Sequence, residues 1–263
     1  MIDRIGLDTG KRALLRAGSA ALLLAWLPSC GRSAAADNGQ TGAAAGDERV
    51  LRKQRSEKRL KAEGVPTNDH LPPIETETEA RLRSAGEVAG RLLALTLVTV
   101  KADGLFSGES AESVRSMIDS AIDERQADGL FTPGEKAFIR ALKPDLNDQI
   151  QFNWRYEAAW VLAWALRWID GPLDPRKGAD VPLLSGIVHD EPDLARRGLR
   201  PLGEILDEAD LIYRYHWAAR EARLRGKPLP QGLTEDVVSE WHHALNWLIG
   251  YQGQAWDEVT TDT

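Results

Sequence analysis

Residues 150–169 carry apolar side chains around almost the whole circumference of a helix, and this segment most constrains the fold. Its large apolar members are Trp154, Trp160, Val161, Leu162, Trp164, Leu166, Trp168 and Ile169. A helix without a polar face cannot lie on the surface, so other elements must cover it on several sides. The segment therefore predicts a Trp-rich central helix with the rest of the domain packed around it.

Apolar residues also recur at helical spacing through the rest of the C-terminal part of the chain. Their stripes predict helices over about 77–101, 109–126, 137–142, 202–224 and 234–249. No convincing alternation of apolar and polar residues marks a strand. We therefore predict an all-α fold, with a single helical domain of about six main helices over residues 75–263.

The first 29 residues have the pattern of an export signal. Residues 11–16 supply three basic side chains, and residues 17–27 form an uncharged run that is too short to span a membrane. The Leu-Pro-Ser-Cys sequence that ends at Cys30 resembles a bacterial lipobox, which implies lipid attachment to Cys30 and cleavage before it. Residues 10–16 also resemble a twin-arginine signal with Lys in place of the first Arg. The export route, Sec or twin-arginine, therefore stays open, as does an ordinary cleaved signal.

These features predict an exported lipoprotein that faces the periplasm and contacts the membrane through acyl chains on Cys30. Gly31 stands where an Asp retains some bacterial lipoproteins in the inner membrane, which favours the outer membrane. Cys30 is the single cysteine of the chain, so an internal disulfide framework is excluded. The formal net charge of −7 argues against a nucleic-acid partner.

Residues 30–74 are predicted to connect the anchor to the domain. Residues 31–46 are rich in Ala, Gly, Ser and Asp and hold no large apolar side chain, which is typical of a flexible tether. Residues 48–63 form a charged run that we expect to be solvated even where it is helical. Pro66 and Pro72 disfavour helical backbone at the residues before them. The compact domain is therefore expected to begin near residue 75.

A short repeat, Ala-Asp-Gly-Leu-Phe, occurs at residues 102–106 and again at residues 127–131. An EF-hand loop needs an oxygen ligand at its third position and a Glu at its twelfth. Both copies have Leu at the third position and a branched apolar residue at the twelfth, so neither fits. We interpret Gly104 and Gly129 as the ends of helices, Ser107 and Thr132 as caps of the helices that follow, and the Leu-Phe pairs as contacts with the core.

Several segments in a fixed order carry a family resemblance. They are Gly64-Val65-Pro66, Leu71-Pro72, Asn153-Trp154-Arg155-Tyr156-Glu157-Ala158, Trp164-Ala165-Leu166, Leu199-Arg200-Pro201, Glu204-Ile205-Leu206-Asp207, Asp210-Leu211-Ile212-Tyr213-Arg214, His216-Trp217, Ala244-Leu245-Asn246-Trp247, Trp256-Asp257 and Asp262-Thr263. As a set they resemble domain-of-unknown-function family 4272, an uncharacterised bacterial family, over about residues 55–263. The resemblance implies no activity, substrate or catalytic residue, because none is established for that family.

The polar residues of the helix predicted over 202–224 offer the most informative chemistry. Asp207 and Asp210 lie one turn apart on one face, with His216 beside them. Together with Glu157 of the central helix, they are candidate general acid and base groups for cleaving a glycosidic bond. The flat or charged walls of such a cleft would come from Trp154, Arg155, Trp164, Arg214 and Trp217.

A structural role explains the same residues. Arg155, Arg200 and Arg214 can neutralise Glu157, Asp207 and Asp210 in buried pairs that fix how helices cross. The Trp residues of the central helix recur every fourth position, and this spacing is more typical of helix packing than of a binding motif.

Metal and cofactor sites find little support in the sequence. His242 and His243 are adjacent, so on a helix they point about 100° apart and cannot easily share one ion. Cys-x-x-Cys, His-Glu-x-x-His and phosphate-loop motifs are absent from the sequence. We predict neither a metal nor a cofactor.

The function that these observations favour is a lipid-anchored, non-enzymatic binding or interaction domain of the bacterial envelope, with an envelope protein or a glycan as its partner. The alternative is an envelope hydrolase that uses the carboxylates in a Trp-lined cleft. The two hypotheses differ in geometry, because an enzyme needs those groups to converge on one open pocket.

Overall fold

A computed structural model describes residues 38–230 and 232–263, and these residues form one compact unit from Asn38 to Thr263. Every regular element in the described ranges is a helix and no strand occurs in them, which confirms the all-α prediction. The predicted export signal, Cys30 and the first residues of the predicted tether lie outside the described residues. None of the described helices has the length and apolar content needed to cross a bilayer.

The described residues form more helices than the six predicted. The limits of the last two helices, predicted over 202–224 and 234–249, agree closely with the structure. The α-helices are α1 (Asn38–Ala62), α2 (Ala85–Phe106), α3 (Ala111–Arg125), α4 (Pro133–Arg140), α5 (Leu146–Asn153), α6 (Arg155–Ala165), α7 (Val181–Asp190), α8 (Leu202–Leu224) and α9 (Glu235–Ile249). Short 3-10 turns cover Asp128–Leu130, Tyr251–Gly253 and Trp256–Glu258. Helices α1 and α7 are additional to those that the apolar periodicity predicts.

The predicted central helix is divided between α5 and α6. The chain turns at Trp154, which caps the end of α5 and the start of α6. Helix α6 then ends short of the predicted limit, because Arg167 takes a left-handed φ of 64°. The N–H groups of Arg167 and Trp168 each donate, at 2.9 Å, to the carbonyls of Trp164 and Ala163 respectively. This is the Schellman arrangement that terminates helices, made here with Arg where Gly is usual.

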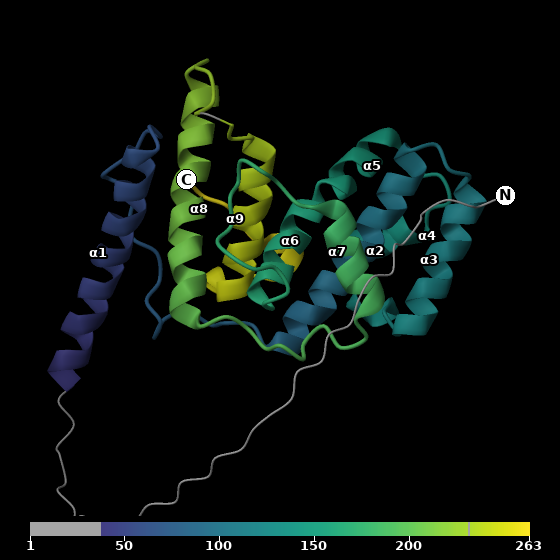
Figure 1. Cartoon of the computed structure of the whole chain (residues 1–263), viewed down its shortest axis with the longest axis horizontal. Helices are drawn as coiled ribbons and strands as arrows, with labels where there is room; N and C mark the ends of the chain where they lie inside the picture. Colours follow the sequence, from purple (N-terminus) through teal and green to yellow (C-terminus); the bar gives the residue numbers. More distant parts are fainter. Residues whose placement is uncertain (1–37, 231) are drawn as a thin grey trace, which may run out of the picture. The chain divides into compact units, whose positions relative to one another are not determined.

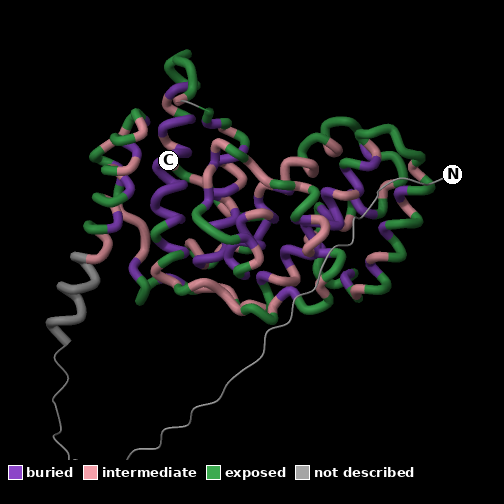
Figure 2. Tube along the Cα trace, in the orientation of Figure 1, coloured by how far each residue is buried: buried purple, intermediate pink, exposed green. Residues whose placement is uncertain are grey.

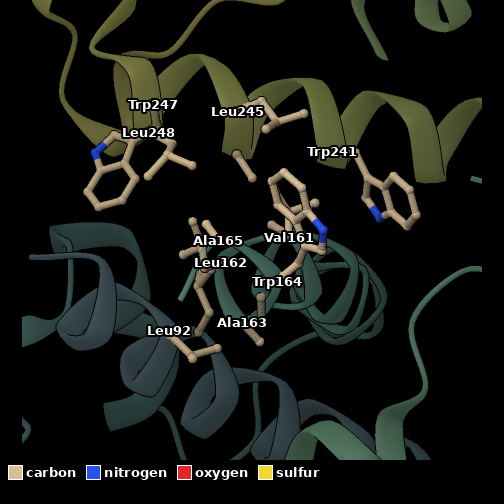
Figure 3. Close-up of a cluster of buried hydrophobic side chains, with 14 of the residues drawn as sticks. Leu92, Val161, Leu162, Ala163, Trp164, Ala165, Trp241, Leu245, Trp247 and Leu248 are labelled. Carbon is tan, nitrogen blue, oxygen red and sulfur yellow. The ribbon is translucent and has the colours of Figure 1, made fainter. Parts of the chain in front are cut away.

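The main core lies where α6 packs against α2 and α9. Figure 3 shows Trp241 of α9 and Trp164 of α6 on facing sides of this core, with Leu92 of α2 beneath them. Trp164 and Trp241 are almost fully buried. Their indole N–H groups donate to the Gly171 carbonyl and the Glu157 carboxylate, both at 2.9 Å. The two large rings therefore fill the core without leaving a buried donor unpaired.

Helix α1 lies beside α8 (Figure 1) and packs against it. Three α1 side chains at a spacing of four residues, Arg52, Ser56 and Leu60, are buried. The expectation that residues 48–63 are solvated is wrong for this face of the helix. The compact unit also begins before residue 75, because α1 belongs to it. The amino-acid composition of α1 does not predict this packing, because two of its three buried residues are polar.

The repeated Ala-Asp-Gly-Leu-Phe segments do not have the same structure. Gly104 lies inside α2 instead of ending it, and a Cβ there would stand 3.1 Å from Val114 of α3, so the glycine permits close packing of the two helices. Ser110, not Ser107, caps α3. Thr132 forms a capping box with α4, as predicted. Leu105 packs against the core as expected, but Phe106 is 58% exposed, so only half of the first Leu-Phe pair fits the prediction. Gly129 does not end α3, because the left-handed Gln126 does so and Gly129 lies in the 3-10 turn that follows.

A buried lysine joins α2 to the end of α4. The Lys101 ammonium donates to the carbonyls of Phe138, Ile139 and Ala141 at 2.9, 2.7 and 2.6 Å. The Phe138 carbonyl also accepts from the Ala141 N–H, so the ammonium adds a partner there and supplies one to the Ile139 and Ala141 carbonyls at the end of α4. Burial lowers the pKa of Lys101 to about 8.

Candidate functional site

Asp210 and Arg214 form an ion pair inside the protein. Helix α8 is buried along most of its length (Figure 2). The Asp210 side chain is fully buried and the Arg214 side chain is 2% exposed. Nε and Nη2 of Arg214 donate to the two carboxylate oxygens at 2.9 and 2.8 Å, a bidentate geometry. Neither residue is available to a ligand, and the predicted pairing of Arg214 with Asp210 is confirmed.

Asp207 has a different environment, on the side of α8 that faces α1. Its Oδ1 accepts from Nε of Arg52 at 2.9 Å and from Nη2 of Arg55 at 2.5 Å. The Asp207 side chain is 48% exposed. Arg200 pairs with Glu204 and not with Asp207, so this part of the predicted network is wrong. Asp207 thus bridges two helices while staying open to solvent.

Glu157 is held by groups from two other parts of the fold. It accepts from the Ala179 backbone N–H at 3.1 Å and from Trp241 Nε1 at 2.9 Å. Burial raises the pKa of Glu157, and these two hydrogen bonds oppose that shift. Arg155, which we expected to neutralise it, instead donates to both oxygens of Glu240 at 3.0 and 2.9 Å. Glu157 therefore ties α6 to α9 by accepting hydrogen bonds.

His216 is paired with a second histidine. Its Nδ1 lies 2.9 Å from Nδ1 of His242, so one neutral ring donates to the other. Burial lowers the pKa of His216 to about 4 and that of His242 well below its usual range. His243, the neighbour of His242, instead meets the Trp256 ring at 4.7 Å between centroids. The two adjacent histidines therefore point to different partners, as their spacing predicts.

The four candidate catalytic residues consequently sit in four separate sets of contacts. Asp210 and His216 are buried, Glu157 is tied to α9, and only Asp207 is substantially exposed. Within residues 38–230 and 232–263, no group of three or more His, Cys, Asp or Glu is placed to hold a metal ion. The geometry that a shared acid–base pair requires is not formed by these residues.

The candidate cleft residues are separated in the same way. Trp164 and Arg214 are buried, and Trp154 and Arg155 lie at the start of α6, where Arg155 pairs with Glu240. Trp217 is different, because it lines an open groove of about 730 Å³ between the 64–70 loop and the end of α8. This groove is the largest of the cavities described for the unit.

Polar groups surround Trp217 in this groove. The loop contributes Asn68, Asp69 and His70, and α8 contributes Glu221 one turn beyond Trp217. The cationic residues Arg225 and Lys227 complete the wall. Glu221 forms an ion pair with Arg225. The sequence identified Trp217 as a candidate cleft residue but gave no sign that the 64–70 loop lies opposite it. Only the docking of α1 on α8 brings that loop to the same groove.

The comparisons with known proteins identify the family alone. A family model described as Domain of unknown function (DUF4272) matches residues 52–259. The chain belongs to this family. No curated protein and no solved structure matches it. The family match begins at Arg52, whose side chain is buried at the α1–α8 contact. Most of the face that α1 presents to α8 is therefore part of the DUF4272 domain and not of a linker.

The buried and exposed aspartates of α8 should respond differently to amidation. Asp210→Asn removes the bidentate partner of the Arg214 charge and leaves only Glu57 near it, at 3.6 Å, which should cost about 3 kcal/mol and lower the melting temperature by on the order of 10 °C. Asp207→Asn, the matched control, should cost at most about 1 kcal/mol, because Asp207 and Arg55 are exposed and the buried Arg52 keeps Glu48 and the Glu75 carbonyl as partners. Thermal unfolding followed by circular dichroism measures both. Equal losses for the two variants would contradict this assignment.

Proposed function

We propose that this chain is a lipid-anchored binding domain of the bacterial envelope, and that the groove beside Trp217 holds a glycan. The domain would be presented to the periplasm by acyl chains on Cys30, with the outer membrane favoured by Gly31. The observation that carries the binding role is the groove itself, in which an aromatic face stands among several polar side chains.

The volume and lining of the groove support a small polar ligand. Ligand pockets are typically about 300–1,000 Å³, and about 730 Å³ falls in that range. The half-buried indole of Trp217 offers an apolar face on which a sugar ring can stack. Asn68, His70 and Glu221 offer donors and acceptors for hydroxyl and acetamido groups. A purely apolar ligand would leave these groups unpaired and is disfavoured.

The distribution of the charged candidates supports binding over hydrolysis. Asp210 is neutralised by Arg214 without access to solvent, and the His216 ring is turned into a buried histidine pair. The hydrolase alternative then depends on Asp69, Glu221 and His70, because these lie in the groove with Trp217. Release of shorter oligosaccharides by the pure protein would favour this alternative.

The anchor is tested by Cys30→Ala. The wild type should fractionate with membranes and the variant should be released into the periplasmic extract, because its acyl attachment atom is gone. Immunoblotting of membrane and soluble fractions measures the outcome. Recovery of the wild-type protein in the soluble fraction would refute the lipid anchor. It would leave the proposal of glycan binding in the groove unaffected.

The groove is tested with oligosaccharides of N-acetylglucosamine and with peptidoglycan disaccharides, titrated by calorimetry. We expect saturable binding by the wild type and at least a tenfold loss in Trp217→Ala, which corresponds to about 1.4 kcal/mol. Trp160→Ala is the matched control, because Trp160 is also partly buried against the core but lies outside the groove. Absence of saturable binding, or an equal loss in the control, would reject the glycan proposal.

A further inference from the structure

A second cavity, of about 180 Å³, lies along the contact between α1 and α8, and its lining is dominated by arginine. Arg52, Arg55 and Arg59 recur at a spacing of three and four residues on α1, so they share one face of the helix. Asp207, Glu208 and Leu211 of α8 form the opposite wall.

The three guanidinium groups differ in how many of their nitrogens donate hydrogen bonds. Arg52 donates from Nε to Asp207, from Nη1 to the Glu75 carbonyl and from Nη2 to Glu48, so all its nitrogens are used. Among residues 38–230 and 232–263, Arg55 donates only through Nη2, to Asp207, and its side chain is 56% exposed. Within the same residues, Arg59 donates only through Nε, at 3.0 Å to Glu63. Arg55 and Arg59 therefore each keep N–H groups for a further acceptor.

Glu208 adds to this cavity a buried carboxyl oxygen that accepts no hydrogen bond from the part of the chain that the structure describes. The residue is 8% exposed, and its Oε1 is buried without a hydrogen-bond partner. Burial raises the pKa of Glu208 to about 7; Arg59 and Arg200 oppose that shift, and Asp207 and Glu204 add to it. Near neutral pH a large share of the molecules thus carries a neutral Glu208 that can donate a hydrogen bond. A buried polar atom left without a partner is costly unless a ligand or water satisfies it.

We propose that this cavity binds a phosphate group, with the free N–H groups of Arg55 and Arg59 donating to its oxygens and the Glu208 carboxyl hydrogen-bonded to one of them. The site is separate from the Trp217 groove, and the proposal does not depend on glycan binding.

Phosphate fits these groups better than a carboxylate does. Arginine forks match the oxygens of both anions. A phosphate monoester, however, has a second pKa near about 6, so the phosphate and Glu208 can share one proton between them in this pH range. A carboxylate ligand is fully ionised in this pH range, so it brings no proton of its own to share with an ionised Glu208. The chain as a whole is acidic, which favours a soluble phosphate group over an anionic lipid surface.

Nuclear magnetic resonance titration of the full chain with inorganic phosphate, at pH 6.5 and constant ionic strength, tests the site. We expect saturable shifts of the amides around Arg55, Arg59 and Glu208, and at least tenfold weaker binding by Arg55→Gln/Arg59→Gln. Arg115→Gln is the matched control, because Arg115 is also an exposed arginine paired with an aspartate on its own helix. It should bind within twofold of the wild type.

The role of Glu208 is tested by repeating the titration at pH 8.5. Ionised Glu208 repels the phosphate dianion, so affinity in the wild type should fall at least about fivefold on going from pH 6.5 to pH 8.5. Glu208→Gln stays neutral and should show no such fall. A wild-type affinity that does not fall, or a fall that persists unchanged in Glu208→Gln, would overturn this role.

Two sources of the phosphate group can be separated with the Cys30→Ala chain. Arginine-dependent sedimentation with vesicles that contain phosphatidic acid, but not with phosphatidylcholine vesicles, would identify a lipid headgroup. Binding of inorganic phosphate without such sedimentation would identify a soluble phosphate. Failure of both probes to give saturable, Arg55- and Arg59-dependent binding would overturn the proposal.

Discussion

The buried pair of Asp210 and Arg214 is the interaction on which the arrangement of the N-terminal part of the domain depends. An arginine inside a protein is tolerated only when its charge and its donors are satisfied. Within α8, Asp210 neutralises the charge of Arg214 and accepts from its Nε and Nη2, and Arg214 also contacts groups outside α8. Its Nη2 donates to the Pro72 carbonyl at 3.2 Å, and its Nη1 lies 3.6 Å from Glu57 of α1. One side chain thus contacts α8, the connecting segment and α1.

Much of the helical core follows from the sequence, because it depends on apolar periodicity. The stripes of α8 and α9 predict their limits closely, and the nearly all-apolar segment around Trp160 predicts a buried region. The end of α6 does not follow, because it depends on the left-handed backbone of Arg167 and not on the apolar pattern. The break at Trp154 also has no signal in the apolar pattern, which continues across it. Helix α1 was missed as a packed element for a different reason: the residues it buries include an arginine and a serine.

The site could be predicted only in part. Spacing along α8 identifies Asp207, Asp210 and Trp217 as candidate site residues, yet the three side chains lie in three different environments. One is exposed and bridges to α1, one is buried in an ion pair, and one lines an open groove. Helical spacing predicts the direction in which each side chain of α8 points, but it does not predict which elements pack against that side of the helix. Those neighbours come from α1 and the 64–70 loop, whose docking combines a few apolar residues, Leu60 and Val65, with polar contacts that apolar periodicity does not reveal.

The buried charges of α8 hold α1 and its loop on the domain. Hydrogen exchange of the double variant Asp210→Leu/Arg214→Met tests this role, because replacing both charges by apolar groups leaves the core without an unpaired ion. Amides of residues 52–62 should exchange at least tenfold faster than in the wild type, while those of α6 and α9 stay equally protected. Unchanged protection of α1 in this variant would contradict it.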